Sequence, residues 1–312
     1  MSEQSQIVVG VDIGNSGLRI ARLFIDDLGQ FSPSLAHRSS CSHRWLGPVG
    51  RIDWKARAAH EISSSLAAPQ YYSDDNAWLD ELDRTLSRCI RLTSDCTGES
   101  IQPLDCQRLP IHWLVSSVRR DATEVLRAHL AQCALYRSLF VTRSDINMSI
   151  DVEFPDRVGV DRLLAAYAAI TLFESRPMIV IQAGSAVTVD WVSPQAEFAG
   201  GAIVPGVPIM LRLLGQAADG LPHLVGRELI ELPNLPGKNT EQAMTCGVSS
   251  AMVGGTQHLV ARYRSQSSPN VPVILSGGDG PRLAKHVPEP LEVVDHLVLV
   301  GLALVAKRAL AR

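Results

Sequence analysis

The sequence contains no run of about 18 or more apolar residues, and Met1–Gln6 lack the basic and apolar regions of a signal peptide. These absences predict a cytoplasmic protein. The chain also has no block of Lys and Arg, and its formal net charge is -3 at pH 7. It therefore lacks the electrostatic footprint that nucleic acid or an anionic membrane requires, and small-molecule partners are favoured.

The six cysteines form no CxxC pair and do not cluster with histidine, so neither a zinc site nor a disulfide framework is indicated. The motifs of protein kinases are absent as well. Gly237–Thr240 is similar to the end of a P-loop, but Leu232 stands where the leading glycine would have to be. A P-loop nucleotide site is therefore excluded.

With 312 residues, of which 46% are hydrophobic and 20% charged, the chain has the composition of an ordinary globular protein. This length allows two hydrophobic cores. We therefore expect two lobes.

Two stretches about 170 positions apart have the pattern of one phosphate-holding turn, namely Val8–Ser16 and Ile179–Ala186. In each, an apolar run typical of a buried strand is followed by a polar residue, a small apolar residue and a glycine. Each predicts a β-hairpin whose turn amides face a ligand, because glycine permits close backbone approach and the following polar side chains add donors. The duplication suggests a nucleotide held between two similar lobes, although two ordinary hairpins would give the same pattern.

The two copies differ at one position, where Asp12 in the first corresponds to Gln182 in the second. A carboxylate beside a phosphate would repel it unless the carboxylate holds Mg²⁺ or its waters. Asp12 is therefore a candidate metal residue, whereas Gln182 cannot supply that charge.

Periodicity in the first half predicts a hairpin over 7–25 and, after a poorly patterned stretch, a helix around 78–92. Strand, helix and strand then alternate. The expected elements of this part are 111–117, 121–133 and 139–142.

The second half begins with an apolar helix over 160–173 and continues with alternating strands and helices. Beyond the loop at Ser276–Gly280 we expect helices to the C-terminus. The elements expected before that loop are strands from 178 through 190, a strand over 200–206, helices over 207–214 and 241–264, and a strand over 271–275.

Asp161 and Arg162 lie in the first turn of the expected helix over 160–173. Asp161 alone could serve only to complement the helix dipole. With Arg162 beside it, the pair offers a carboxylate that accepts a proton and a guanidinium that binds a substrate carboxylate through two hydrogen bonds, which phosphorylation of a hydroxy acid needs. Ser276–Gly278 is either a plain turn or a place where adenine or ribose lies flat against the backbone.

Taken in order, six motifs resemble those of the type III pantothenate kinases, which belong to the actin-like, sugar-kinase and Hsp70 superfamily. They cover residues 7–25 and about 111–312. The six motifs are Asp12–Ser16 (similar to DxGNT), Gly159–Arg162 (GxDR), Gly184–Thr188 (GTAxT), Gly200–Gly206 (GGxIxPG), Gly237–Thr240 (GxxT) and Ser276–Asp279 (TGGD).

The resemblance implies an α/β protein of two ribonuclease-H-like lobes, each a mixed sheet flanked by helices, with a nucleotide cleft between them. The lobes would span 1–157, with an insertion in 28–110, and 158–312. The implied reaction is ATP-dependent phosphorylation of pantothenate, the first step toward coenzyme A. The resemblance also implies Mg²⁺, a monovalent cation (K⁺ or NH₄⁺) and a homodimer.

The resemblance also implies a role for individual residues. Asp161 would be the catalytic base, Arg162 would hold the pantothenate carboxylate, and Gly159 would line the same substrate site. Asp12 would position Mg²⁺. The residues implied in holding ATP and its phosphates are Asp12, Gly14, Asn15, Ser16, Gly184, Ser185, Thr188, Gly277 and Gly278.

The sequence departs from the family pattern at Gln182 (usually Asp), Val152 (usually Tyr) and Ala218 (usually Thr). Two alternatives therefore stand beside the pantothenate kinase. One is a non-catalytic relative that binds nucleotide or regulates, which Gln182 favours. The other is a kinase for another small hydroxy acid. Retention of Asp12 and Asp161 favours an enzyme.

Overall fold

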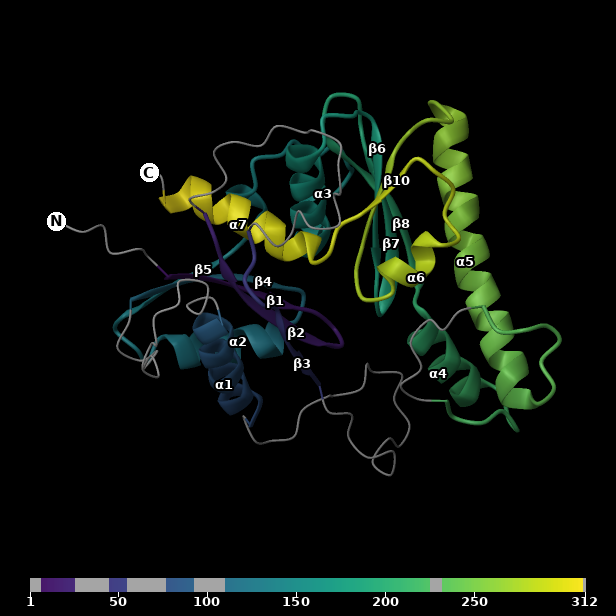
Figure 1. Cartoon of the computed structure of the whole chain (residues 1–312), viewed down its shortest axis with the longest axis horizontal. Coiled ribbons are helices and arrows are strands. Elements are labelled where there is room, and N and C mark those ends of the chain that lie inside the picture. The colour runs from purple at the N-terminus through teal and green to yellow at the C-terminus, as the bar shows by residue number, and fades with distance from the viewer. Residues whose placement is uncertain (1–6, 26–44, 55–76, 93–109, 225–231, 311–312) are drawn as a thin grey trace. The chain divides into compact units, whose positions relative to one another are not determined.

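The structure is a computed structural model that describes residues 7–25, 45–54, 77–92, 110–224 and 232–310 (Figure 1). The chain forms two compact units. The described residues within Met1–Gln30, His43–Asp145 and Val298–Arg312 belong to the first unit, and those within Ile146–Leu297 belong to the second. Much of the expected insertion in 28–110 lies outside the described residues. The lobe boundary expected after residue 157 stays a prediction.

A mixed sheet of five strands forms the centre of the first unit, in the order β3-β2-β1-β4-β5. β1 pairs antiparallel with β2 and parallel with β4. β2 pairs antiparallel with β3, and β4 pairs parallel with β5. The strands are β1 (Ile7–Ile13), β2 (Gly17–Leu23), β3 (Gly50–Asp53), β4 (Ile111–Ser117) and β5 (Tyr136–Phe140).

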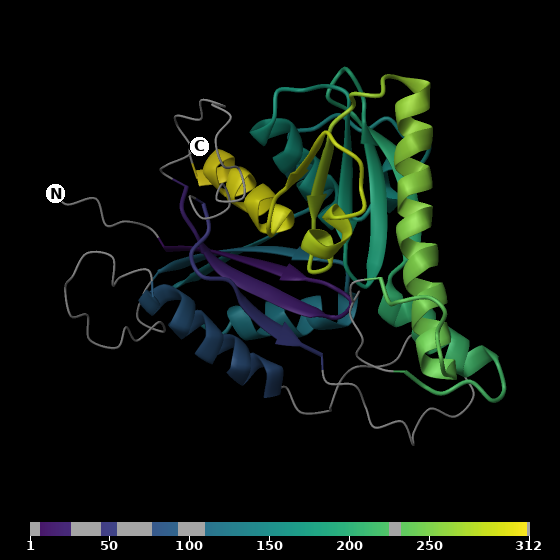
Figure 2. The same ribbon diagram turned by 45° about the vertical axis from the view of Figure 1, so that its right-hand side comes forward.

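Helices cover both faces of this sheet. The apolar faces of α1 (Ala77–Leu92) and α2 (Arg120–Leu130) pack with side chains of β1, β2 and β4 in one core cluster. Figures 1 and 2 show α7 (Leu297–Leu310) along the opposite face. β1 is buried along almost its whole length, as expected for a central strand covered on both faces. A short 3₁₀ turn, η7 (Arg143–Asp145), ends the His43–Asp145 segment of this unit.

The second unit has its own five-stranded mixed sheet, in the order β10-β9-β6-β7-β8. β6 pairs antiparallel with β7 and parallel with β9, while β7–β8 is antiparallel and β9–β10 parallel. The strands are β6 (Met178–Ala183), β7 (Ala186–Val192), β8 (Phe198–Pro205), β9 (Val273–Ser276) and β10 (Leu291–Val293).

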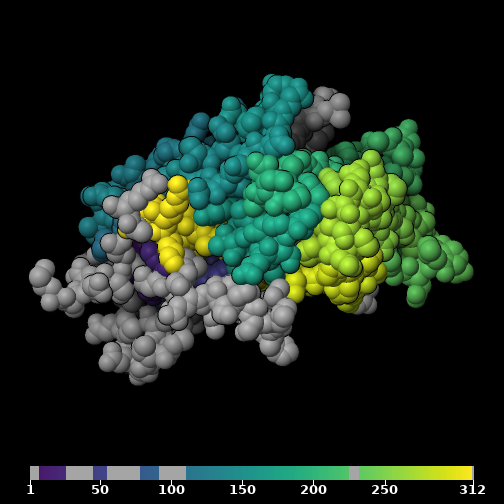
Figure 3. Space-filling view, turned by 90° about the horizontal axis from the view of Figure 1, so that it is seen from above, coloured from purple at the N-terminus to yellow at the C-terminus, as the bar shows by residue number. Residues whose placement is uncertain are grey.

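Figures 1 and 2 show α3 (Val160–Leu172) and α5 (Thr240–Gln266) on opposite faces of the second sheet. The short 3₁₀ turn η8 (Pro155–Arg157) precedes α3, and α4 (Val207–Ala217) and α6 (Gly280–Ala284) complete the unit. One core cluster joins β6, β7 and β9 to α4, α5 and α6. The outer side of α5 is exposed at the surface (Figure 3).

The two sheets have the same topology. If the strands of each unit are numbered in chain order, both sheets read third, second, first, fourth, fifth. In both, the second strand runs antiparallel to the first and the third, and the last two run parallel to the first. This arrangement confirms the expected α/β fold class, with two mixed sheets flanked by helices.

Most expected elements are found within a few residues of their predicted ends, but β3 was not predicted, because it lies in the poorly patterned stretch of the first half. β5 begins three residues earlier than expected, because Tyr136 already pairs with Ile111 of β4. The expectation of only helices after Ser276–Gly280 was wrong, because β10 intervenes. Its three residues have too little pattern to be recognised locally, and pairing with β9 makes them a strand. Among the described residues, no helix is both long and apolar enough to cross a membrane.

Replacement of Leu82 by Ala tests whether α1 is part of the first core. Leu82 lies on α1 and is 0% exposed. Loss of its side chain should therefore lower the free energy of unfolding by about 2–5 kcal/mol, measured by urea denaturation. The matched control is Arg84→Ala on the same helix, whose side chain is 68% exposed. It should change the free energy by less than about 0.5 kcal/mol. Equal effects of both changes would contradict the packing of α1.

Candidate active site

The Gly14 turn connects β1 and β2 at one end of the first sheet. The amide of Gly14 donates to the carbonyl of Gly17 at 2.9 Å, which closes the turn. Asn15 and Ser16 at its tip are exposed. Their backbone and side-chain donors are therefore accessible, as an anion-binding turn requires.

Asp12 lies on β1, two residues before Gly14, and only 9% of its surface is exposed. It stands opposite Arg19 of β2 and Ser116 of β4. The described residues contain no group of three or more His, Cys, Asp or Glu that could hold a metal ion. Mg²⁺ is commonly held by one or two carboxylates together with substrate phosphates and waters. A single carboxylate beside a turn that is predicted to bind phosphate fits this mode.

The Gly184 turn connects β6 and β7 in the second unit, in the same topological position as the Gly14 turn. The amide of Gly184 donates to the carbonyl of Ala186 at 3.0 Å. Ser185 is half-buried, and so are Gln182 and Thr188, which stand opposite each other on the two strands. The structure therefore confirms the predicted hairpin and brings these three polar side chains to the same end of the sheet.

The Gly277–Gly278 loop packs directly against the Gly184 turn. Gly277 has a φ of +100°, and a Cβ built there would lie 2.2 Å from the carbonyl oxygen of Ala183. Only glycine fits this position. The amide of Asp279 donates to the same carbonyl at 3.1 Å. The structure thus places three of the expected ATP residues, Gly184, Gly277 and the exposed Gly278, at one end of the second sheet.

Asp161 lies in the first turn of α3, two residues after Gly159, which caps the helix. Its Oδ1 accepts the backbone amide of Arg162 at 2.8 Å. Burial raises the pKa of Asp161, and the amide and charge of Arg162 oppose that rise. A carboxylate with a raised pKa holds an accepted proton better, which suits a general base.

Gln182 connects the Asp161 segment to the Gly184 turn. Its side-chain amide donates a long hydrogen bond of 3.5 Å to the backbone carbonyl of Asp161. Because Gln182 lies on β6, two residues before Gly184, this contact joins the start of α3 to the strand that leads into the turn. A carboxylate could not donate this bond, so the departure from the family pattern has a structural consequence here.

Arg162 makes a side-on ion pair with Asp190 of β7. Its Nε donates to the two carboxylate oxygens at 3.0 and 3.3 Å, and its Nη2 donates to Oδ1. Asp190 is completely buried, and 14% of the Arg162 side chain is exposed. Burial raises the pKa of Asp190, while the hydrogen bonds and charge of Arg162 lower it. The ring of Phe198 lies 5.3 Å from the guanidinium carbon.

Asp190 holds one side of the guanidinium and leaves the other for a ligand. Arginine has five N–H donors, and the side-on pair with Asp190 uses those of Nε and one of Nη2. Nη1 has no hydrogen-bond partner within the described part of the chain. A planar acceptor such as a carboxylate can therefore still bind through Nη1 and Nη2.

Asp190 belongs to the site although the sequence did not predict it there. The feature of the sequence that could have identified Asp190 is its carboxylate, which lies within the otherwise largely apolar strand β7. A charge placed in a buried strand needs a partner, so its position pointed to an ion pair but not to which arginine. Arg162 is 28 residues away, and only the packing of α3 on the sheet brings the two together.

Three further positions from the family comparison, Asn239, Val152 and Ala218, lie at the start of a helix, near a strand glycine and at the end of a helix. Asn239 caps α5, because its side chain accepts the amide of Gln242 at 2.9 Å. The Gly237–Thr240 segment therefore leads into a helix, as predicted. Val152 is half-buried near Gly200, and Ala218 ends α4.

Comparison with known proteins identifies the family. The family model of type III pantothenate kinases matches residues 72–262. The type III pantothenate kinase of Rhodopirellula baltica is 31% identical over 302 residues, covering 95% of this chain and 96% of that protein. That of Albidiferax ferrireducens is 32% identical over 207 residues, covering 64% of this chain and 78% of that protein.

Among solved structures, a conserved putative Baf family transcriptional activator from Campylobacter jejuni is 16% identical, with a TM-score of 0.49 over 97% of this chain and all of that one. The family assignment comes from the sequence matches, which extend over most of the chain and include the Asp161–Arg162 and Gly184 segments. The chain belongs to the type III pantothenate kinase family.

Proposed function

We propose that the protein transfers the γ-phosphate of ATP to the primary hydroxyl of pantothenate. The observation that carries this proposal is the adjacency of Asp161, whose pKa burial raises, and Arg162, whose Nη1 is not used by the ion pair with Asp190. One group accepts the hydroxyl proton and its neighbour binds the carboxylate of the same acceptor. Membership of the family supports pantothenate as that acceptor.

The Arg162–Asp190 pair orients the acceptor in this proposal. A guanidinium that rotated freely would lose side-chain entropy each time it bound a carboxylate. The ion pair with Asp190 already fixes its plane. Binding of the pantothenate carboxylate through Nη1 and Nη2 would then place the hydroxyl end of the acceptor at Asp161, and Gly159 would line the same site.

The two glycine turns would hold ATP. In the first unit the donors of Gly14, Asn15 and Ser16 would bind phosphate oxygens. In the second unit the corresponding groups are Gly184, Ser185 and Thr188, with the Gly277–Gly278 loop against the nucleoside. Asp12 would hold Mg²⁺, which neutralises the charge that develops on the phosphates during transfer.

The proposal also includes a monovalent cation, K⁺ or NH₄⁺, a homodimeric assembly and a cytoplasmic location, all supported by family membership. A second candidate function is a non-catalytic relative that binds nucleotide. Gln182 favours it, because its amide contacts the Asp161 backbone where the family usually has an acidic side chain. A kinase for another small hydroxy acid remains the third reading.

One assay separates these functions. ATP consumption is measured with pantothenate and Mg²⁺, in K⁺ or in Na⁺, and with other hydroxy acids in place of pantothenate. We expect turnover with pantothenate that is faster in K⁺. Turnover only with another acid would identify a different kinase. ATP binding without turnover on any acceptor would identify the non-catalytic relative.

Asp161→Asn tests the role of the base. An amide cannot accept the hydroxyl proton, so kcat should fall by about 10²–10⁴-fold while the melting temperature stays close to that of the wild type. Asp151→Asn is the matched control, because Asp151 is an exposed carboxylate nearby in the sequence. It should keep activity within about threefold, less than 1 kcal/mol on the transition-state scale. Retained activity in Asp161→Asn would remove Asp161 from this role.

The pH dependence of kcat/KM gives an independent test. Only ionised Asp161 can act as the base, and burial raises the pKa of Asp161. The acid limb of the profile should therefore lie above the ordinary aspartate value of about 3.9. Arg162→Gln removes a positive charge that lowers this pKa, so the limb should move to still higher pH. A limb at the ordinary value, unmoved by Arg162→Gln, would contradict the assignment.

A further inference from the structure

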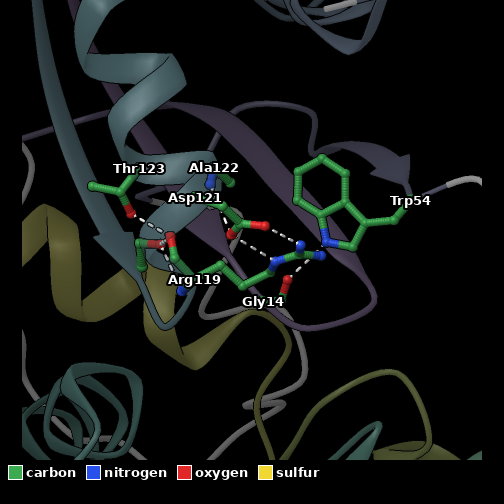
Figure 4. Close-up of polar contacts among 7 residues, drawn as sticks. Gly14, Trp54, Arg119, Asp121, Ala122 and Thr123 are labelled. Carbon is green, nitrogen blue, oxygen red and sulfur yellow. Dashed lines mark hydrogen bonds and ion pairs between the residues drawn. The ribbon is translucent and has the colours of Figure 1, made fainter. Parts of the chain in front are cut away.

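Trp54 donates hydrogen bonds to two backbone carbonyls of the Gly14 turn. It directly follows β3 and is 7% exposed. Its indole Nε1 donates to the carbonyl of Gly14 at 2.9 Å (Figure 4). Its backbone amide donates to the carbonyl of Ser16 at 3.0 Å. Trp54 falls within 28–110, a region for which the sequence predicted no role.

The indole of Trp54 is held in place from two directions. The guanidinium carbon of Arg119 lies 5.3 Å from the centre of the ring, and Arg119 is itself paired with Asp121 at the start of α2 (Figure 4). The ring of Trp78, on α1, meets Trp54 edge-on at 5.6 Å. These contacts fix the direction of the indole N–H, so its bond to Gly14 has little freedom.

The second unit supports its turn with the same backbone bond but without a side chain. Gly206 directly follows β8, as Trp54 follows β3, and its amide donates to the carbonyl of Ser185 at 2.8 Å. A Cβ at Gly206 would lie 2.2 Å from the carbonyl oxygen of Gly184. In the second unit the backbone of Gly206 therefore packs on that oxygen, whereas in the first unit an indole N–H binds the corresponding one.

The direction of these carbonyls decides whether a turn binds an anion. A carbonyl oxygen carries partial negative charge and repels phosphate, whereas an amide N–H attracts it. A glycine turn can rotate its peptide planes at little cost. By binding the carbonyl oxygens of Gly14 and Ser16, Trp54 holds them against the protein.

The geometry points to Trp54 as the positioning residue of the Gly14 turn, which keeps the turn in the conformation that binds a nucleotide phosphate. This inference rests on the proposed function of the turn as a phosphate-binding element. It predicts that the indole N–H contributes to ATP affinity although Trp54 does not itself contact ATP.

Trp54→Phe and Trp78→Phe form a matched pair for the test. Both replace a buried tryptophan of the same core cluster and remove one indole N–H. The Nε1 of Trp78 has no hydrogen-bond partner within the described residues, whereas that of Trp54 binds Gly14. The pair thus separates loss of the hydrogen bond from loss of ring volume.

The measurement is the dissociation constant of Mg·ATP by calorimetry without acceptor, together with kcat and the KM for pantothenate. Trp54→Phe should raise the dissociation constant of Mg·ATP by about three- to tenfold, which corresponds to the net free energy that one hydrogen bond usually contributes. The KM for pantothenate should stay unchanged. Trp78→Phe keeps an aromatic ring beside Trp54 and should change neither. Wild-type affinity in Trp54→Phe, or equal weakening in both variants, would overturn the inference.

The outcomes distinguish this inference from the proposed reaction. If the wild type binds ATP without phosphorylating pantothenate and Trp54→Phe alone weakens binding, the inference stands and the reaction fails. If the wild type phosphorylates pantothenate and Trp54→Phe binds ATP normally, the reaction stands and the inference fails. A wild type that binds no ATP would overturn both.

Nuclear magnetic resonance of the wild type provides a second test that does not depend on the folding of Trp54→Phe. The chain has five tryptophans, so ¹⁵N-labelling of tryptophan gives five indole signals. Single Phe substitutions at the other four assign the Trp54 signal by elimination. ATP should move that signal more than the signal of Trp78. An unmoved Trp54 signal at saturating ATP would overturn the inference.

Discussion

The buried ion pair between Arg162 and Asp190 is the constraint on which the candidate active site depends. Asp190 is fully buried in β7, and an unpaired charge there would cost several kcal/mol. Its partner must therefore be a cation held firmly nearby. Because Arg162 lies in the first turn of α3, the pair fixes the start of that helix on the sheet, and Asp161 is fixed with it. The proposed base is thus positioned by the same neighbour that is proposed to bind the acceptor.

Support of the glycine turns follows one plan in both units. The residue after the third strand donates its amide to a turn carbonyl, through Trp54 in the first unit and Gly206 in the second. The loop after the fourth strand donates to the last residue of the first strand, from Val118 to Ile13 and from Asp279 to Ala183, each at 3.1 Å. The repeated topology therefore accounts for two similar turns, while the side chains at these positions make the turns chemically different.

The sequence predicted the features that depend on local pattern. The hairpins around Gly14 and Gly184 and helix α3 follow from periodicity and glycine placement, and the structure confirms them. Asp190 and β10 were missed because distant pairing defines both. Trp54 was missed for the same reason, since Gly14 lies 40 residues away in sequence. The roles of the individual site residues stay predictions.

The most direct test of the account is the effect of Asp190→Asn on the two substrates. Asn keeps the size of Asp but loses the charge that orients the Arg162 guanidinium. At saturating ATP, the KM for pantothenate should rise by more than about threefold, while the KM for ATP stays within about twofold, because the proposed role of Arg162 is to bind the acceptor and not ATP. A KM for pantothenate that is unchanged or lower, in a variant that remains folded, would show that Asp190 does not orient Arg162 for the acceptor and would contradict the account.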